Sequence, residues 1–144
     1  MIALLVSLLF TPTAPAKFDD AALRARLTAS AEEKSKLLIY TWSPQMPLSV
    51  KGLAELMETK GKRDYRVLVL LDDGANTKVA AKVAKDHKWP AAVLERNESL
   101  ELRKQGSRLH YPSYVFVKDG KYVGALLPGY RNHEELADLA ARKF

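Results

Sequence analysis

Two aliphatic runs separated by a helical pattern set the fold class of this chain. Residues 37–42 and 66–72 are almost continuously apolar, which is typical of strands buried on both faces. Between them, Leu48, Leu53 and Leu56 recur on one side of a predicted helix. A strand, a helix and a second strand in this order favour parallel neighbours in one sheet. The sequence therefore predicts an α/β protein.

The remaining segments extend this alternation. A hairpin with a Gly-containing turn is predicted from 114–117 through 118–121 to 122–127, and it adds antiparallel strands. The short apolar piece 91–94 is expected to supply one more strand. We therefore expect a central mixed sheet flanked by helices. Besides the one between the two runs, helices are predicted at 18–34, 77–88, 98–109 and 133–143, the last capped by Asn132.

The segment after the first predicted strand combines a helix start with an unusual choice of side chains. Ser43 is suited to cap the helix and Pro44 to occupy its first position, and the helix is expected to end near Gly61. Met46 carries a flexible thioether, so it is interpreted as core filler beneath the turn.

Four segments together point to a known superfamily. They are residues 40–46 (Tyr-Thr-Trp-Ser-Pro-Gln-Met), 67–72, 109–117 and 119–124. In this order they resemble the thioredoxin-like superfamily, and within it the secreted or periplasmic proteins akin to cytochrome-maturation reductases. The resemblance covers residues 35–144 and implies a thioredoxin-like fold. It also implies a cis proline at Tyr111-Pro112 that faces the turn.

The resemblance places Ser43 and Met46 at the two positions where a redox-active member has cysteines. The chain contains no cysteine, so it can neither form nor exchange a disulfide by itself. Leu37 stands where thioredoxin keeps a buried carboxylate, in agreement with a loss of proton transfer. A dithiol oxidoreductase is therefore excluded.

In redox relatives, a groove between the turn and the proline loop holds an extended segment of the partner. The same geometry predicts that this chain binds a protein or peptide partner by strand addition. Packing beneath the turn is an equal alternative for Trp42 and Tyr111, because cores and interfaces use the same aromatic residues. The residues expected to line the groove are Trp42, Pro44, Gln45, Tyr111 and Pro112.

Other functions stay open at this point. A thioredoxin-like enzyme of thiol-disulfide or peroxide metabolism could rely on an external thiol, and a purely structural domain of an envelope complex is a further alternative. A hydrolase would need His110 to activate Ser43. No cofactor is expected, and no metal, because the histidines lack ligand spacing.

Asp72 and Asp73 follow a predicted parallel strand at its carboxyl end, where α/β folds often place function. Residues 73–77 also have the composition of an ordinary turn followed by a helix cap. The turn is the preferred interpretation of this segment.

The N-terminal residues predict the compartment. Residues 2–10 are mostly apolar and 13–16 supply small residues at the positions that a signal peptidase reads, so a signal peptide is predicted at 1–16. A mis-assigned start or a buried first strand is the alternative, since no Lys or Arg precedes the apolar run. We expect a secreted or periplasmic protein in which a helical segment, 17–34, precedes the thioredoxin-like domain, 35–144.

The charge pattern limits the class of partner. The formal net charge is +6, but Lys and Arg are spread without a basic block or interleaved aromatic residues. This pattern argues against nucleic-acid binding. Weak attraction to an anionic membrane or cell-wall polymer remains, so membrane association is expected to be peripheral at most. The oligomeric state is not indicated.

Overall fold

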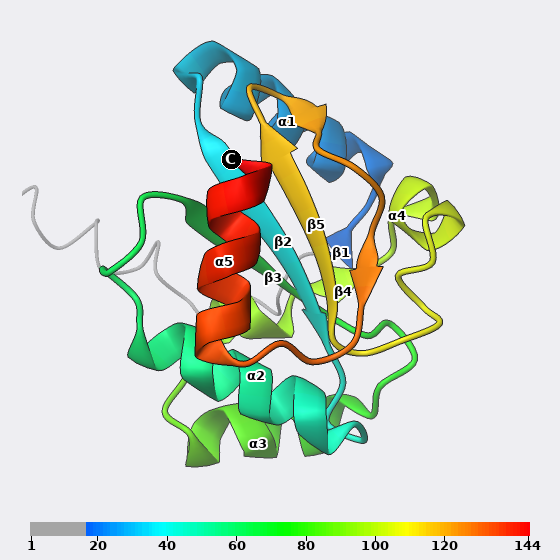
Figure 1. The fold of residues 1–144 in the computed structure, drawn as a ribbon. Coiled ribbons are helices and arrows are strands. Elements are labelled where there is room, and N and C mark those ends of the chain that lie inside the picture. Colours follow the sequence, from blue (N-terminus) through cyan, green and yellow to red (C-terminus); the bar gives the residue numbers. More distant parts are fainter. Residues whose placement is uncertain (1–16) are drawn as a thin grey trace, which may run out of the picture.

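A mixed sheet lies at the centre of the protein (Figure 1). The computed structural model describes residues 17–144, so the predicted signal peptide lies outside the described residues. The strands are β1 (Lys17–Phe18), β2 (Lys36–Trp42), β3 (Arg66–Leu71), β4 (Arg96–Asn97), β5 (Ser113–Lys118), β6 (Lys121–Tyr122) and β7 (Leu127–Pro128). The helices are α1 (Asp20–Glu33), α2 (Pro47–Glu58), α3 (Thr77–Asp86), α4 (Leu100–Lys104) and α5 (His133–Lys143), with a 3-10 turn, η2 (Ala91–Leu94).

The strand order is β1-β4-β3-β2-β5-β6, and β7 pairs with β5. β2 runs parallel to β3 and antiparallel to β5. The predicted α/β class and the mixed sheet are therefore confirmed. Within residues 17–144, no helix is long and apolar enough to cross a membrane.

Alternating side chains of β2 and β3 divide the core between the two faces of the sheet. Tyr40 and Trp42 point to the face covered by α2, α3 and α5 (Figure 1). Ile39 and Leu70 point to the face where Leu23 of α1 packs. Both faces are buried, which explains why the two runs are apolar at almost every position.

The cap predicted for the last helix is confirmed. Asn132 accepts a hydrogen bond from the N–H of Glu135, and the Glu135 side chain reaches back to the Asn132 N–H to complete a capping box. α3 begins at Thr77, as predicted, with Asn76 as its cap.

Two predictions between β3 and β5 are wrong. Residues 91–94 form the 3-10 turn η2 and not a strand, and the neighbouring strand is the short β4. The helix predicted at 98–109 extends only over Leu100–Lys104. Gly106 adopts a φ of 103°, which an α-helix cannot contain, so the chain leaves the helix there.

Two strand boundaries also differ from the prediction. Phe18 lies in β1, outside the helix, because it pairs with Asn97 of β4 and is buried in the sheet. The second strand of the hairpin, predicted at 122–127, is broken into β6 and β7. Gly124 lies in the break with a φ of 78°.

Candidate functional site

The turn after β2 and the loop before β5 meet at one end of the sheet. The antiparallel register pairs Thr41 with Ser113, which places residues 43–46 close to Tyr111-Pro112. The Tyr111–Pro112 peptide bond is cis, as the resemblance implies. The hydroxyl oxygens of Thr41 and Ser113 lie 2.5 Å apart, and the Ser113 N–H donates to Thr41 Oγ1 at 3.1 Å. Buried hydrogen bonds therefore fix the two segments relative to one another.

The beginning of α2 differs from the prediction. Met46 is the residue before the helix and Pro47 occupies its first turn, so Ser43 is not the cap and Pro44 is not the first helical residue. Ser49 replaces the predicted cap. Its Oγ accepts the Ser43 N–H at 3.0 Å and lies 2.8 Å and 2.7 Å from the carbonyl oxygens of Ser43 and Met46. One buried hydroxyl thus closes the whole turn.

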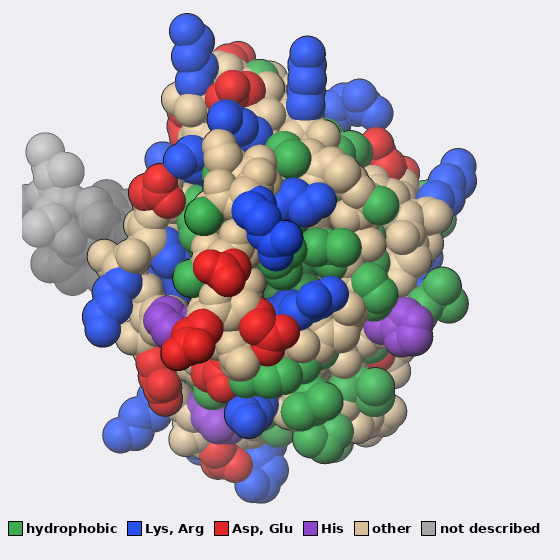
Figure 2. Space-filling model, in the orientation of Figure 1, with side chains coloured by type: hydrophobic (Ala, Val, Ile, Leu, Met, Phe, Trp, Pro, Cys, Tyr) green, Lys and Arg blue, Asp and Glu red, His purple; other side chains and the backbone are tan. Residues whose placement is uncertain are grey.

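Met46 does not fill the core. The residue is 44% exposed, and Leu48 in the first turn of α2 is 54% exposed. Leu109, in the loop before the cis proline, is 76% exposed. Figure 2 shows hydrophobic side chains gathered at the lower right, over the beginning of α2. We call Gln45, Met46, Leu48 and Leu109 the turn surface.

Trp42 packs in the core, so its predicted place in a groove is wrong. The side chain is completely buried, and its Nε1–H donates to the carbonyl oxygen of Val93 at 2.8 Å. The ring contacts Trp89 edge-on, with centroids 5.6 Å apart. Pro112 is buried as well. Neither Trp42 nor Pro112 therefore exposes a side chain that a partner could contact.

The other predicted groove residues lie nearer the surface. Gln45 is exposed, whereas Pro44 and Tyr111 are half-buried. Tyr111 donates its hydroxyl hydrogen to Asp72 Oδ1 at 2.9 Å. Burial, followed by the Asp72 carboxylate, raises the pKa of Tyr111. The phenol is therefore neutral and holds the loop against the end of β3.

The sequence reasoning missed an ion-pair network beside this phenol. Asp73 accepts hydrogen bonds from Arg103 and from Arg108, the latter at 2.6 Å. Asp72 also accepts the Gly74 N–H at 3.0 Å, which is the turn geometry that the sequence favours. The only sequence signal for this network was the opposite charge of Asp73 and of the arginines in residues 103–108. No sequence spacing relates these two segments.

The geometry does not support the hydrolase alternative. Ser43 is only 2% exposed, and in the described part of the chain no hydrogen bond joins it to a histidine. His110 lies in the exposed part of the loop. Nor do residues 17–144 hold a group of three His, Cys, Asp or Glu side chains arranged for a metal ion.

Comparison with solved structures relates the fold to that of known proteins. The exposed lipoprotein thioredoxin of Streptococcus pneumoniae strain TIGR4 matches with a TM-score of 0.59 at 18% identity, over 81% of this chain and 89% of that one. The fold is thioredoxin-like. A candidate thioredoxin from Neisseria meningitidis gives a TM-score of 0.58 at 17% identity, over 83% of this chain and 77% of its own. No family model and no curated protein matches the chain.

A further thioredoxin-like neighbour is a thiol:disulfide interchange protein from Chlorobium tepidum, with a TM-score of 0.57 at 11% identity over 83% of each chain. Its name describes a thiol reaction, whereas this chain has no cysteine. This thioredoxin-like protein therefore lacks the reacting groups of a dithiol redox enzyme.

Proposed function

We propose that this thioredoxin-like protein binds a protein or peptide partner through the turn surface and performs no redox chemistry. The supporting observation is that Met46, Leu48 and Leu109 expose apolar side chains where the resemblance places the redox turn and the proline loop. Exposed apolar groupings on a folded protein mark interaction sites. Methionine suits such a surface, because its flexible side chain adapts to different partners.

The layer beneath the turn surface supports binding with little rearrangement. Ser49 closes the turn, the Thr41–Ser113 pair fixes the two segments, and Tyr111 ties the loop to Asp72. A surface that is already ordered loses less entropy when a partner docks. We therefore assign recognition to the exposed side chains and positioning to the buried polar groups.

The same proposal includes the cellular setting. We assign the protein to the secreted or periplasmic thioredoxin-like proteins. The apolar run and small residues in 1–16 support this assignment, and the pneumococcal neighbour is described as an exposed lipoprotein. Signal-peptide cleavage, read from the mature N-terminus of the expressed full chain, tests it.

A crosslinking experiment tests the binding surface. A photoreactive amino acid at Gln45 is expected to capture a partner from envelope extract, since this residue is exposed beside Met46. Replacing Met46, Leu48 and Leu109 together by serine should abolish capture. The matched control replaces Val79 and Leu100 by serine, because both are exposed apolar residues outside the turn surface.

Equal capture by the two variants would overturn the proposal, because recognition would then not depend on the turn surface. Capture of nothing by the unmodified surface would overturn it too. Circular dichroism of both variants shows whether the fold is retained, which is expected because each replaced side chain is exposed.

A further inference from the structure

The edge of β3 that faces away from β2 is only partly paired. β4 reaches β3 at a single position, where Leu71 lies opposite Arg96. The preceding residues of β3 pair with β2 on one side, and η2 stands beside them in place of a strand on the other. Half of a central strand is therefore left as a sheet edge.

The backbone direction shows which groups this edge presents. The N–H of Leu71 donates to the carbonyl oxygen of Glu95 at 2.8 Å, away from β2. Successive residues of a parallel strand direct their N–H and C=O groups to opposite sides, so Val69 and Val67 face the same side as Leu71. Outside the ladder with β2, no backbone hydrogen bond within residues 17–144 involves Val67 or Val69. The N–H and C=O groups of both residues therefore have no backbone partner on this side; Val67 is half-buried, and Val69 is buried beside η2.

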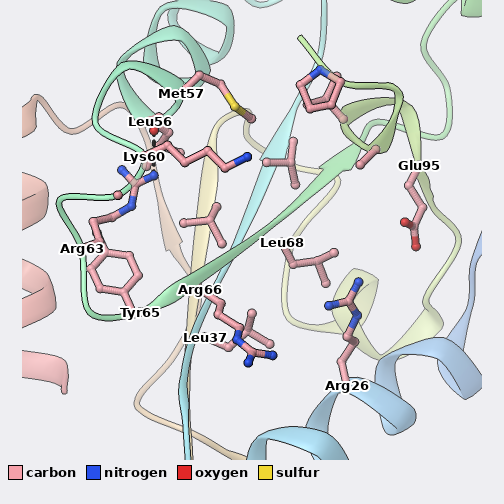
Figure 3. Close-up of a pocket in the computed structure, with 16 residues that line it drawn as sticks. Arg26, Leu37, Leu56, Met57, Lys60, Arg63, Tyr65, Arg66, Leu68 and Glu95 are labelled. Carbon is pink, nitrogen blue, oxygen red and sulfur yellow. Dashed lines mark hydrogen bonds between the residues drawn. The ribbon is translucent and has the colours of Figure 1, made fainter.

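A cavity of about 420 Å³ lies along this edge and extends over both faces of the sheet (Figure 3). On one face its wall is apolar and formed by Leu56 and Met57 of α2. On the other face Leu37 and Leu68 line it, with Arg26 of α1. The side chains of an added strand alternate between two faces, and the cavity provides room and apolar contact on each.

The wall of the cavity is strongly positive. It contains four cations and one carboxylate: Arg26, Lys60, Arg63, Arg66 and Glu95. Figure 3 shows Lys60 extending from the end of α2 towards the other residues that line the cavity. Arg66 pairs with Glu33 at 3.0 Å, but within residues 17–144 neither Arg26 nor Lys60 forms an ion pair.

Arg63 is fixed in place without a carboxylate. Its guanidinium donates to the Leu56 carbonyl oxygen at 2.7 Å and to Thr59 Oγ1 at 2.5 Å. Burial lowers the pKa of Arg63 from its ordinary value, which is the effect of a cation held in a partly desolvated position. An anion beside it would recover the lost solvation.

We propose that the open half of β3 is a docking edge for an extended acidic segment of a partner protein. The segment adds as a strand beside Val67 and Val69, its apolar side chains fill the cavity, and its carboxylates pair with Arg26, Lys60 and Arg63. The backbone supplies affinity and the cations select the sequence. This surface is separate from the turn surface, and the inference does not depend on the function proposed above.

Amide hydrogen exchange of the full chain tests the docking edge. The probe is a short synthetic peptide that repeats two glutamates followed by two valines, so that each face of the added strand carries both carboxylates and apolar side chains. At saturating peptide, exchange at Val67 and Val69 should slow by about tenfold or more, while Leu68 and Leu70, which already bond to β2, stay unchanged. An N-methylated peptide of the same sequence keeps the charge, but its methyl groups stand along the hydrogen-bonding edge and prevent strand pairing, so it should give no protection.

Matched charge reversals separate strand addition from general attraction. Arg26→Glu with Lys60→Glu should weaken peptide binding by about tenfold or more, because both cations line the cavity. Lys78→Glu with Lys85→Glu changes the net charge equally on exposed α3 and should leave most of the affinity. The same peptide with lysine in place of glutamate should not bind.

Several results would overturn the inference. One is the absence of peptide binding at about 1 mM. Another is binding without protection of Val67 and Val69, or protection that appears at residues 43–48 instead. Equal loss of affinity in the two charge variants would also overturn it, since the peptide would then respond to net charge alone.

Discussion

At the residue scale, Ser49 carries the structure of the turn. Its hydroxyl oxygen accepts the Ser43 N–H, which has no other hydrogen bond within residues 17–144, and its hydroxyl hydrogen is shared between the carbonyl oxygens of Ser43 and Met46. Ser49→Ala is therefore expected to lower the free energy of unfolding by about 1–3 kcal/mol, the usual cost of unsatisfied buried polar groups. Urea denaturation measures this change. Thr28→Ala on the exposed face of α1 is the control, and an equal effect of both changes would contradict the assigned role.

Gly52 gives a second prediction at this scale. A Cβ at this position would meet the hydroxyl of Tyr40, which is fully buried and bonded to the Ser49 carbonyl oxygen at 2.7 Å. Gly52→Ala should thus destabilise the protein by about 1–3 kcal/mol, although alanine favours helices.

The double variant with Tyr40→Phe identifies the cause. Without the hydroxyl there is room for the Cβ, so Gly52→Ala should cost much less in the Tyr40→Phe background than alone. Additive costs in thermal or urea denaturation would show that another contact is responsible.

Single residues also show what a sequence can and cannot reveal about the site. Ser43 and Met46 mark the turn and show that the two cysteines of a redox-active relative are absent. Whether Trp42 lines a groove or fills the core could not be decided, since its indole finds a partner in Val93, far along the chain. The closing hydroxyl of Ser49 was missed because a serine inside a helix pattern has no distinctive spacing.

At the element scale, Asp20 joins the beginnings of α1 and α4. It accepts hydrogen bonds from the Ser99 hydroxyl at 2.7 Å and from the Glu101 N–H at 3.1 Å, and these bonds lower the pKa of Asp20. A carboxyl with a lowered pKa in the folded state stabilises the protein above the pKa of the unfolded state. That contribution is lost as the pH falls through the folded pKa.

Asp20→Ala should therefore destabilise the protein most at neutral pH, and the difference from the wild type should shrink below about pH 4. Urea midpoints across the acid range give this profile. Asp138→Ala on the exposed face of α5 is the control, because no ion pair within residues 17–144 involves that carboxylate. A difference that is independent of pH would mean that Asp20 acts through packing alone.

The late start of α2 leads to a prediction about restored cysteines. In Ser43→Cys with Met46→Cys, the first thiol lies before Met46 and not at the helix start, and residue 43 is buried. Helix N-termini lower thiol pKa values and burial raises them. The pKa of the thiol at residue 43 should therefore be at or above about 8.5, measured by thiolate absorbance. A pKa below about 7 would contradict this expectation, because it would mean that the helix N-terminus stabilises the thiolate at residue 43.

Helices and strands were predicted correctly where the sequence pattern was long. The prediction failed where a single residue ended the element. The strands 37–42 and 66–72 and the last helix follow from their periodicity and caps. The helix expected at 98–109 has the right composition, but Gly106 ends it by a backbone conformation that composition does not reveal. β1 pairs with β4, which follows it only after β2 and β3 in the sequence, and a two-residue strand has no periodicity to detect.

At the scale of the whole molecule, a thioredoxin-like fold is present without its thiols. The protein should reduce no disulfide substrate above background. None of its 144 residues is a cysteine, so it has no thiol that can exchange with a disulfide. A turbidity assay of insulin reduction with an external thiol measures this, and an active dithiol thioredoxin is the positive control. Turnover that depends on this protein would support the enzyme alternative.

The open half of β3 also has a consequence for contacts between copies of the same chain. A strand edge with free N–H and C=O groups can pair with the same edge of another molecule. Proteins commonly prevent this pairing with charged side chains on the edge. Where two of these edges meet, Lys60, Arg63 and Arg66 bring like charges together. The cations that favour an acidic strand thus also act as gatekeepers, and their removal would turn a binding edge into an aggregation hazard.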